Sequence, residues 1–142
     1  MKQCLVDVNI LLPLLVRHHK HHQPARKWLD SLSPGEAGVC RLVQLALARL
    51  LANRSIMGGF AIPASDAWRL IRELLEDERF EFITEPLIDD ILPKLFRYAV
   101  PTPNLIMDAY LAAFALAANR RIATFDRGFR QFGELEVDLV QD

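Results

Sequence analysis

The most constraining feature of this sequence is an acidic residue inside a long apolar segment. Residues 105–118 are apolar except for Asp108 and the phenol of Tyr110. A helix that is apolar all round is a buried helix, and a carboxylate inside it costs several kcal/mol unless it is compensated. The chain then passes into a strand-like run at 122–125 and reaches a second acid, Asp126. Two acids that bracket a helix and a strand indicate a functional site.

Length and composition are those of one ordinary globular domain, which we expect to span residues 1–142. The 17 basic and 18 acidic residues give a net charge of -1. This balance excludes a generic polyanion binder, so any nucleic-acid contact must come from a local basic patch. Cys4 and Cys40 fit no disulfide or zinc spacing, which predicts reduced thiols in the cytoplasm. No apolar run approaches the roughly 18 residues of a membrane span, so we expect no membrane contact.

A third acid follows the first predicted strand. Residues 3–6 form a short apolar run that ends at Asp7, and residues 8–16 continue as a predicted helix. In open α/β sheets, ligands bind beyond the carboxyl ends of the strands. Asp7 is therefore expected at the binding edge, and Asn9 could face the same side.

The remaining pattern alternates strands with helices, which predicts a parallel sheet covered on both faces. Thr124 and Asp126 follow the strand period of two and share one side of their strand. With this topology Asp7 and Asp126 converge at one edge, and Asp108 can reach the same point because it lies near the start of its helix. Strands are expected at 80–84, 122–125 and 135–140 (the last at the sheet edge), and helices at 24–32, at 39–51, after Pro63, after Pro86 and after the N-cap residue Asn104.

Several polar features have alternative interpretations. All four histidines lie in residues 17–22, where His18 and His22 have the spacing to share a metal on a helix, although a solvated loop is the simpler interpretation. Arg41 and Gln44 form a polar stripe on the helix at 39–51, which must face a polar cavity, an interface or solvent. The pair Asp89-Asp90 is interpreted as a favourable charge in the first turn of a helix.

Three carboxylates that lie close together repel each other and stay ionised only if cations compensate them. Oxygen ligands suit Mg²⁺ or Mn²⁺, which can activate water and stabilise both reacting oxygens of a phosphodiester. The pattern therefore favours a metal-dependent nuclease. The alternative is that Asp108 pairs with an arginine such as Arg121, and that Asp7 and Asp126 are ordinary turn acids.

Three short motifs carry a family resemblance. The sequences DVNILL at 7–12, NLIMDAYLAA at 104–113 and TFDRGF at 124–129 resemble those of the PIN-domain family, especially the toxins of VapBC-type toxin–antitoxin systems. The resemblance implies a three-layer α/β/α fold with a short, mostly parallel sheet. It also implies a Mg²⁺- or Mn²⁺-dependent endoribonuclease that leaves a 5′-phosphate and a 3′-hydroxyl, a cognate antitoxin protein and a homodimer.

Carried over to this chain, the resemblance makes Asp7, Asp108 and Asp126 the catalytic, metal-binding acids, with Thr124 and Asn9 in support. Many PIN domains carry a glutamate on the helix where this chain has Gln44. An amide can still bind a metal or its water but brings no charge, so Gln44 is expected to support a weaker site. Glu36 is an upstream acid that could substitute for the missing glutamate.

RNA binding requires positive charge near the acids. The candidates are Arg41, Arg127 and Arg130, and Arg17 and Lys20 could extend the rim. Two other functions are kept open. A phosphotransferase would use Asp7 as its nucleophile, although Asn9 replaces the usual second acid. A PIN-like module could instead bind RNA or protein and cleave poorly, because Gln44 dilutes the charge of the site.

Overall fold

The computed structural model describes residues 2–141 (for Tyr98, the backbone alone), so the ends of the domain expected over 1–142 lie outside the described residues. Its centre is a five-stranded sheet in the order β3-β2-β1-β4-β5, and every neighbouring pair is parallel. The predicted parallel sheet is confirmed. The strands are β1 (Cys4–Val6), β2 (Ala37–Val39), β3 (Phe80–Phe82), β4 (Arg121–Thr124) and β5 (Val137–Leu139).

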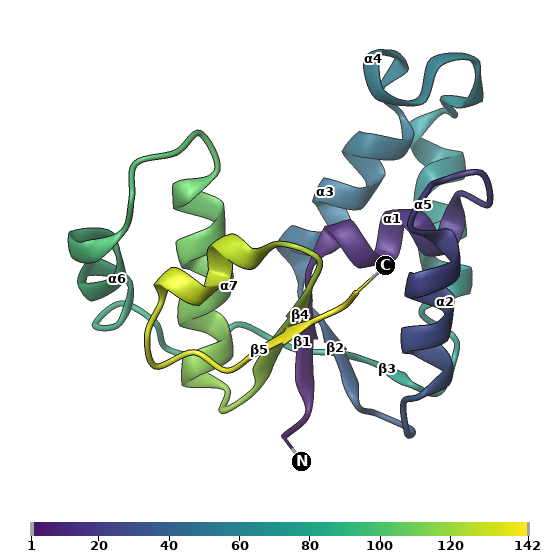
Figure 1. Ribbon diagram of the computed structural model, residues 1–142. Helices are drawn as coiled ribbons and strands as arrows, with labels where there is room; N and C mark the ends of the chain where they lie inside the picture. Colours follow the sequence, from purple (N-terminus) through teal and green to yellow (C-terminus); the bar gives the residue numbers. More distant parts are fainter. Residues whose placement is uncertain (1, 142) are drawn as a thin grey trace.

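Helices cover both faces of the sheet, which gives three layers (Figure 1). The chain first adds strands outward from β1 to β3, and it then crosses back to add β4 and β5 on the other side of β1. Right-handed crossovers therefore place the helices before β3 on one face and those after β3 on the other. The first face carries α1 (Val8–Leu15), α2 (His22–Asp30), α3 (Arg41–Leu51) and α5 (Ala64–Leu74), and the second carries α6 (Leu92–Tyr98), α7 (Leu105–Ala117) and the 3-10 turn η2 (Arg127–Gln131). No helix described over residues 2–141 is long and apolar enough to cross a membrane.

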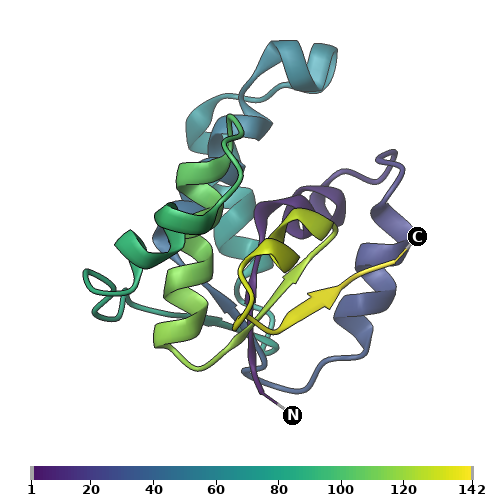
Figure 2. The same cartoon turned by 60° about the vertical axis from the view of Figure 1, so that its left-hand side comes forward.

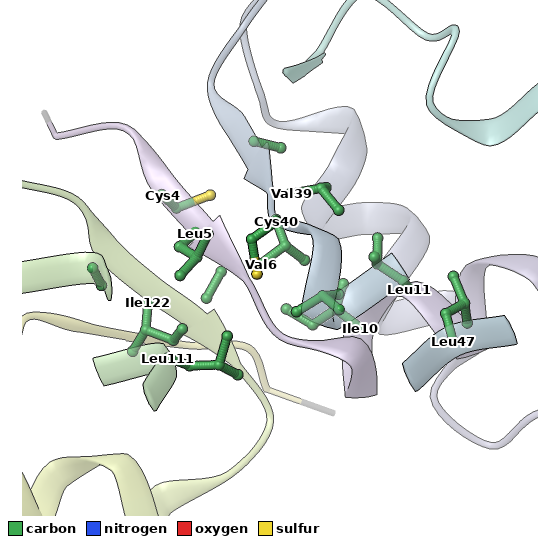
Figure 3. Close-up of a cluster of buried hydrophobic side chains, with 14 of the residues drawn as sticks. Cys4, Leu5, Val6, Ile10, Leu11, Val39, Cys40, Leu47, Leu111 and Ile122 are labelled. Carbon is green, nitrogen blue, oxygen red and sulfur yellow. The ribbon is translucent and has the colours of Figure 1, made fainter. Parts of the chain in front are cut away.

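The core gathers around β1. Cys4, Leu5 and Val6 are fully buried, as expected for a central parallel strand that is covered on both faces. Figure 3 shows Leu111 and Ile122 on one side of this strand and Ile10, Leu11 and Leu47 beyond it on the other.

In the turned view of Figure 2 the last strand, β5, runs towards α2, and the Trp28 indole N–H donates to Asp138 over 3.4 Å.

The structure corrects several predicted boundaries. The helix predicted at 39–51 begins at Arg41, because residues 37–39 form the unpredicted strand β2. The helix predicted after Pro86 begins only at Leu92, so Asp89-Asp90 precede it and do not occupy its first turn. Residues 54–60, which follow α3, form two short helical turns, α4 (Arg54–Met57) and η1 (Gly58–Phe60). Asn104 is the N-cap residue of α7, as predicted, but its side chain makes no capping hydrogen bond.

Two buried arginines hold the amino edge of the sheet together. The Arg121 side chain donates to Glu36 over 2.8 Å and to Asp138 over 3.4 Å. Arg120 donates to the Cys4 carbonyl over 2.9 Å. These contacts join β1, β4 and β5 to the segment before β2, at the edge of the sheet opposite to the carboxyl ends of the strands.

Gly38 in β2 is required by this arginine cluster. A Cβ atom at this position would lie 2.7 Å from Arg120 Nη1, 2.9 Å from the Cys4 carbonyl oxygen and 2.9 Å from Ile83 Cγ1. We predict that Gly38→Ala lowers the free energy of unfolding by about 1–3 kcal/mol through overpacking, as measured by urea denaturation. Gly59→Ala is the matched control, because a Cβ there meets nothing within 4 Å. Equal stability of the two variants would contradict the prediction.

Candidate active site

Asp7 occupies the end of the central strand. It directly follows β1 and is the N-cap residue of α1, and its side chain is only 7% exposed. The positive end of the helix dipole favours a carboxylate here. Burial nevertheless raises the pKa of Asp7, the hydrogen bond from Thr124 lowers it, and the nearby Asp126 raises it further. The buried position of Asp7 is thus set by the strand-to-helix turn and needs compensation.

The Thr124 hydroxyl connects the ends of β1 and β4. It donates to Asp7 Oδ2 over 2.8 Å and accepts the Asp126 backbone N–H over 2.9 Å and Asn9 Nδ2 over 3.1 Å. The Asn9 side-chain oxygen in turn accepts the Phe125 N–H over 3.2 Å. One buried hydroxyl therefore fixes the positions of two acids from strands far apart in the sequence.

Asp126 and Asp108 complete the group. Asp126 is exposed, and its Oδ1 accepts the Gly128 N–H over 2.7 Å at the start of η2. Asp108 is half-buried in the first turn of α7. Burial first, and then the charges of Asp7 and Asp126, raise the pKa of Asp108 to about 6. All three acids line the same cleft.

These acids border a cleft of about 410 Å³ at the carboxyl edge of the sheet. One wall is the first part of α7, with Asn104, Met107 and Leu111, and the other is α3. The cleft lies where strand order reverses between β1 and β4, and this switch point is where α/β sheets bind ligands. Among residues 2–141, no ion pair neutralises Asp7, Asp108 or Asp126.

The structure corrects the role expected for the stripe on α3. Gln44 is 5% exposed and lines a separate cavity between α3, α5 and β3, where its Oε1 accepts Arg41 Nη1 over 2.6 Å. The Arg41 guanidinium lies 4.8 Å from the Phe82 ring centre. Neither side chain faces the acids. The cleft wall of α3 is formed by Leu42, Val43, Leu45, Ala46 and Arg49.

Arg49 is a basic residue of the cleft that the sequence pattern did not reveal. It lies a little off the polar stripe, and its helical spacing from Leu42, Leu45 and Ala46 shows that it shares their face. Arg127 and Arg130 are exposed on η2, directly after Asp126. Neither is among the described residues that line the cleft.

Three alternatives are excluded by the contacts. Arg121 pairs with Glu36 at the amino edge of the sheet, so it does not neutralise Asp108 and Glu36 cannot join the acids. His18 packs on Phe60 with ring centres 4.5 Å apart, while His22 Nδ1 donates to the Pro13 carbonyl over 2.7 Å. The two histidines therefore diverge and do not form a shared metal site.

The chemistry of the donor set fits a hard divalent cation. The acids offer carboxylate oxygens only, and they lack compensating positive charge, which is the environment that Mg²⁺ or Mn²⁺ prefers. Across residues 2–141 no three His, Cys, Asp or Glu side chains lie close enough together, as they stand, to hold a metal ion. The Asp126 carboxylate, for example, is turned towards the Gly128 N–H.

The parallel sheet and the acidic cleft at its switch point define an α/β protein with a candidate metal-binding site at the carboxyl edge. The profile of the PIN domain matches residues 4–135, and the chain belongs to this family. It is 38% identical to ribonuclease VapC41 of Mycobacterium tuberculosis, over 96% of this chain and 97% of the relative. It is 30% identical to ribonuclease VapC37 of the same organism, over 94% of each chain.

Solved structures share the fold at low sequence identity. VapBC-1 from nontypeable Haemophilus influenzae aligns with a TM-score of 0.67 at 16% identity, over 97% of this chain and 98% of the other. The Mycobacterium tuberculosis toxin VapC20, described as cleaving the sarcin-ricin loop, aligns with a TM-score of 0.67 at 14% identity, over 92% and 95%. The predicted three-layer α/β/α fold is confirmed.

The raised pKa of Asp108 predicts a stability cost. An acid whose pKa is about 6 in the folded protein, against an ordinary 3.8, binds more protons when folded, so stability falls as pH rises through this window. We predict that Asp108→Asn raises the melting temperature by a few degrees at pH 7.5 in EDTA, and that the difference shrinks towards pH 4. Differential scanning calorimetry measures both, with a substitution of an exposed turn residue, Asp89→Asn, as control. A lower melting temperature for Asp108→Asn than for the wild type at pH 7.5 would overturn this explanation.

Proposed function

We propose that this protein is a metal-dependent endoribonuclease that acts as the toxin of a type II toxin–antitoxin system. The carrying observation is the convergence of Asp7, Asp108 and Asp126 at the switch point without any ion pair among the described residues. The names of the relatives support the reaction class, since they are ribonucleases. The VapBC complexes among the structural neighbours support a protein antitoxin as partner, which in this proposal covers the cleft.

The three acids are proposed to hold Mg²⁺ or Mn²⁺. When bound, such an ion lowers the pKa of a water and stabilises the attacking and leaving oxygens of an RNA phosphodiester. Thr124 and Asn9 orient Asp7 and the chain before Asp126. Arg49, on the opposite wall, is placed to bind the phosphate backbone, and Leu45 and Met107 offer apolar contact to bases or sugars. In this proposal the RNA substrate lies between α3 and α7, and the toxin works in the cytoplasm as a homodimer.

A second candidate function rests on the α3 wall. Among the described residues that line the cleft, those from α3 include no carboxylate. Fewer negative charges weaken the binding of a divalent cation. This composition favours the alternative of a PIN domain that binds RNA and cleaves it slowly.

Cleavage of a mixed pool of structured RNAs by the purified protein tests the proposal. We expect cleavage in Mg²⁺ or Mn²⁺, none in EDTA, and none with Asp108→Asn, whereas Asp89→Asn cleaves like the wild type. Cleavage that survives Asp108→Asn would refute the assignment of the site. Metal-stimulated RNA binding without cleavage would support the second candidate.

Metal binding has its own readout in thermal stability. A ligand that binds only the folded state stabilises it by about 2.7 kcal/mol at one hundred times its dissociation constant. We predict that Mn²⁺ raises the melting temperature of the wild type and that Asp108→Asn loses most of this rise. An equal rise in both proteins would place the ion elsewhere.

The Thr124 hydroxyl is predicted to position the acids. Thr124→Val keeps the volume and removes all three hydrogen bonds, so we expect a loss of about 10–100-fold in metal affinity, as for other groups that orient metal ligands. Thr124→Ser should recover most of the affinity, because it restores the hydroxyl. Metal titrations followed by melting temperature separate this role from a packing role, in which Thr124→Val would bind metal like the wild type.

A further inference from the structure

A second hollow, of about 440 Å³, adjoins the acidic cleft on the side of the histidine-rich loop. Val8, Asn9 and Asp126 line both hollows. The far wall of the second hollow comes from His19, Lys20, His21 and Phe125. The two hollows are therefore neighbouring parts of one continuous surface, with Asp126 at their border.

The loop that forms this wall is held in place by specific contacts. The His21 ring stacks on Phe125 with centres 4.3 Å apart and an interplanar angle of 19°. The His21 backbone N–H donates to His19 Nδ1 over 3.0 Å, and His22 Nδ1 donates to the Pro13 carbonyl. Lys20 is exposed between these residues. The loop thus presents a stacked aromatic pair and a cation next to Asp126.

We propose that this hollow binds the nucleotide adjacent to the cleaved phosphodiester, with the base against the His21–Phe125 pair and its phosphate near Lys20. The inference rests on the proposed ribonuclease function. Aromatic side chains bind the bases of single-stranded RNA by stacking, and lysine binds the phosphates. Because Asp126 borders both hollows, a strand whose reacting phosphate lies at the acids can continue directly into this one.

A nucleotide fits this surface better than an acidic protein segment. The wall combines one lysine with an aromatic stack, and a nucleotide supplies a phosphate and a planar base in a single unit. A carboxylate-rich peptide would gain from Lys20 alone and has no planar base to place against the aromatic stack. The geometry therefore favours RNA, and a protein occupant is an outcome of the test.

RNA binding by Asp108→Asn protein tests the inference without cleavage. The probe is a fluorescein-labelled single-stranded RNA of about 12 randomised nucleotides, a length in the range that such surfaces bind, followed by fluorescence anisotropy at several KCl concentrations. In this background we expect Lys20→Ala with His21→Ala to weaken binding about tenfold, since stacking of one base is worth about 5–150-fold in affinity. The salt slope should fall by roughly 0.7, because one phosphate is no longer neutralised by a lysine. Lys20→Ala with His21→Phe should recover affinity without recovering the slope.

The matched control removes the same two residue types elsewhere. Lys27→Ala with His18→Ala takes one lysine from the exposed surface of α2 and the histidine that packs on Phe60. We expect it to bind within twofold of the parent. If the variant with Lys20→Ala and His21→Ala also binds RNA within twofold of the parent while wild-type protein cleaves RNA, only this inference fails. The second hollow would then be a candidate site for a protein partner. If wild-type protein neither cleaves nor binds RNA, the proposed function fails with it. Melting temperatures of both variants exclude unfolding as the cause.

Discussion

The buried carboxylate of Asp7 is the constraint on which the rest of the structure depends. A carboxylate that is only 7% exposed needs hydrogen bonds and a favourable field. It receives the Thr124 hydroxyl, and it lies at the positive end of α1. That hydroxyl can reach it only because β1 and β4 are parallel neighbours, in register from Cys4 with Arg121 to Val6 with Ala123. The register of the two central strands and the geometry of the acids are therefore one feature.

The two edges of the sheet differ in whether their charged side chains are paired. At the amino edge, Arg121 is paired with Glu36 and Asp138, and Arg120 is bonded to the Cys4 carbonyl. At the carboxyl edge, burial and then the charges of neighbouring acids raise the pKa values of Asp7 and Asp108, and no arginine pairs with them among the described residues. Paired buried charges serve the assembly of the sheet, whereas unpaired ones lower its stability. The unpaired charge is maintained at the place where strand order reverses and a ligand can enter.

The parts that the sequence predicted well are those with a strong local signal. An apolar strand that ends at Asp7, and an apolar helix that leads through β4 to Asp126, each fix the position of an acid within one or two residues. Strand β2 escaped prediction because Ala37 and Gly38 have little strand propensity, and Gly38 is there to leave room for Arg120, a residue so distant in the chain that no local pattern reveals the contact. Gln44 was assigned to the site from its place in the family pattern, because helical spacing defines a face but does not say which neighbour that face meets. The orientation of α3 about its own axis is such that Gln44 lines the cavity at β3 and Arg49 lines the cleft.

The two walls of the cleft differ in charge because of this orientation of α3. All three carboxylates come from β1, β4 and α7, and α3 contributes apolar side chains and one arginine. A cation held by the acids would therefore lie close to the α7 side, and a polyanion would be attracted to the α3 side by Arg49. The opposite signs of charge on the two walls orient a phosphodiester between them. In the proposed function, long-range attraction of RNA would come from charges outside the cleft, because the whole chain has a net charge of only -1. Lys20 on the loop before α2, and Arg127 and Arg130 on η2, are exposed basic side chains on the Asp126 side of the cleft that would supply this attraction.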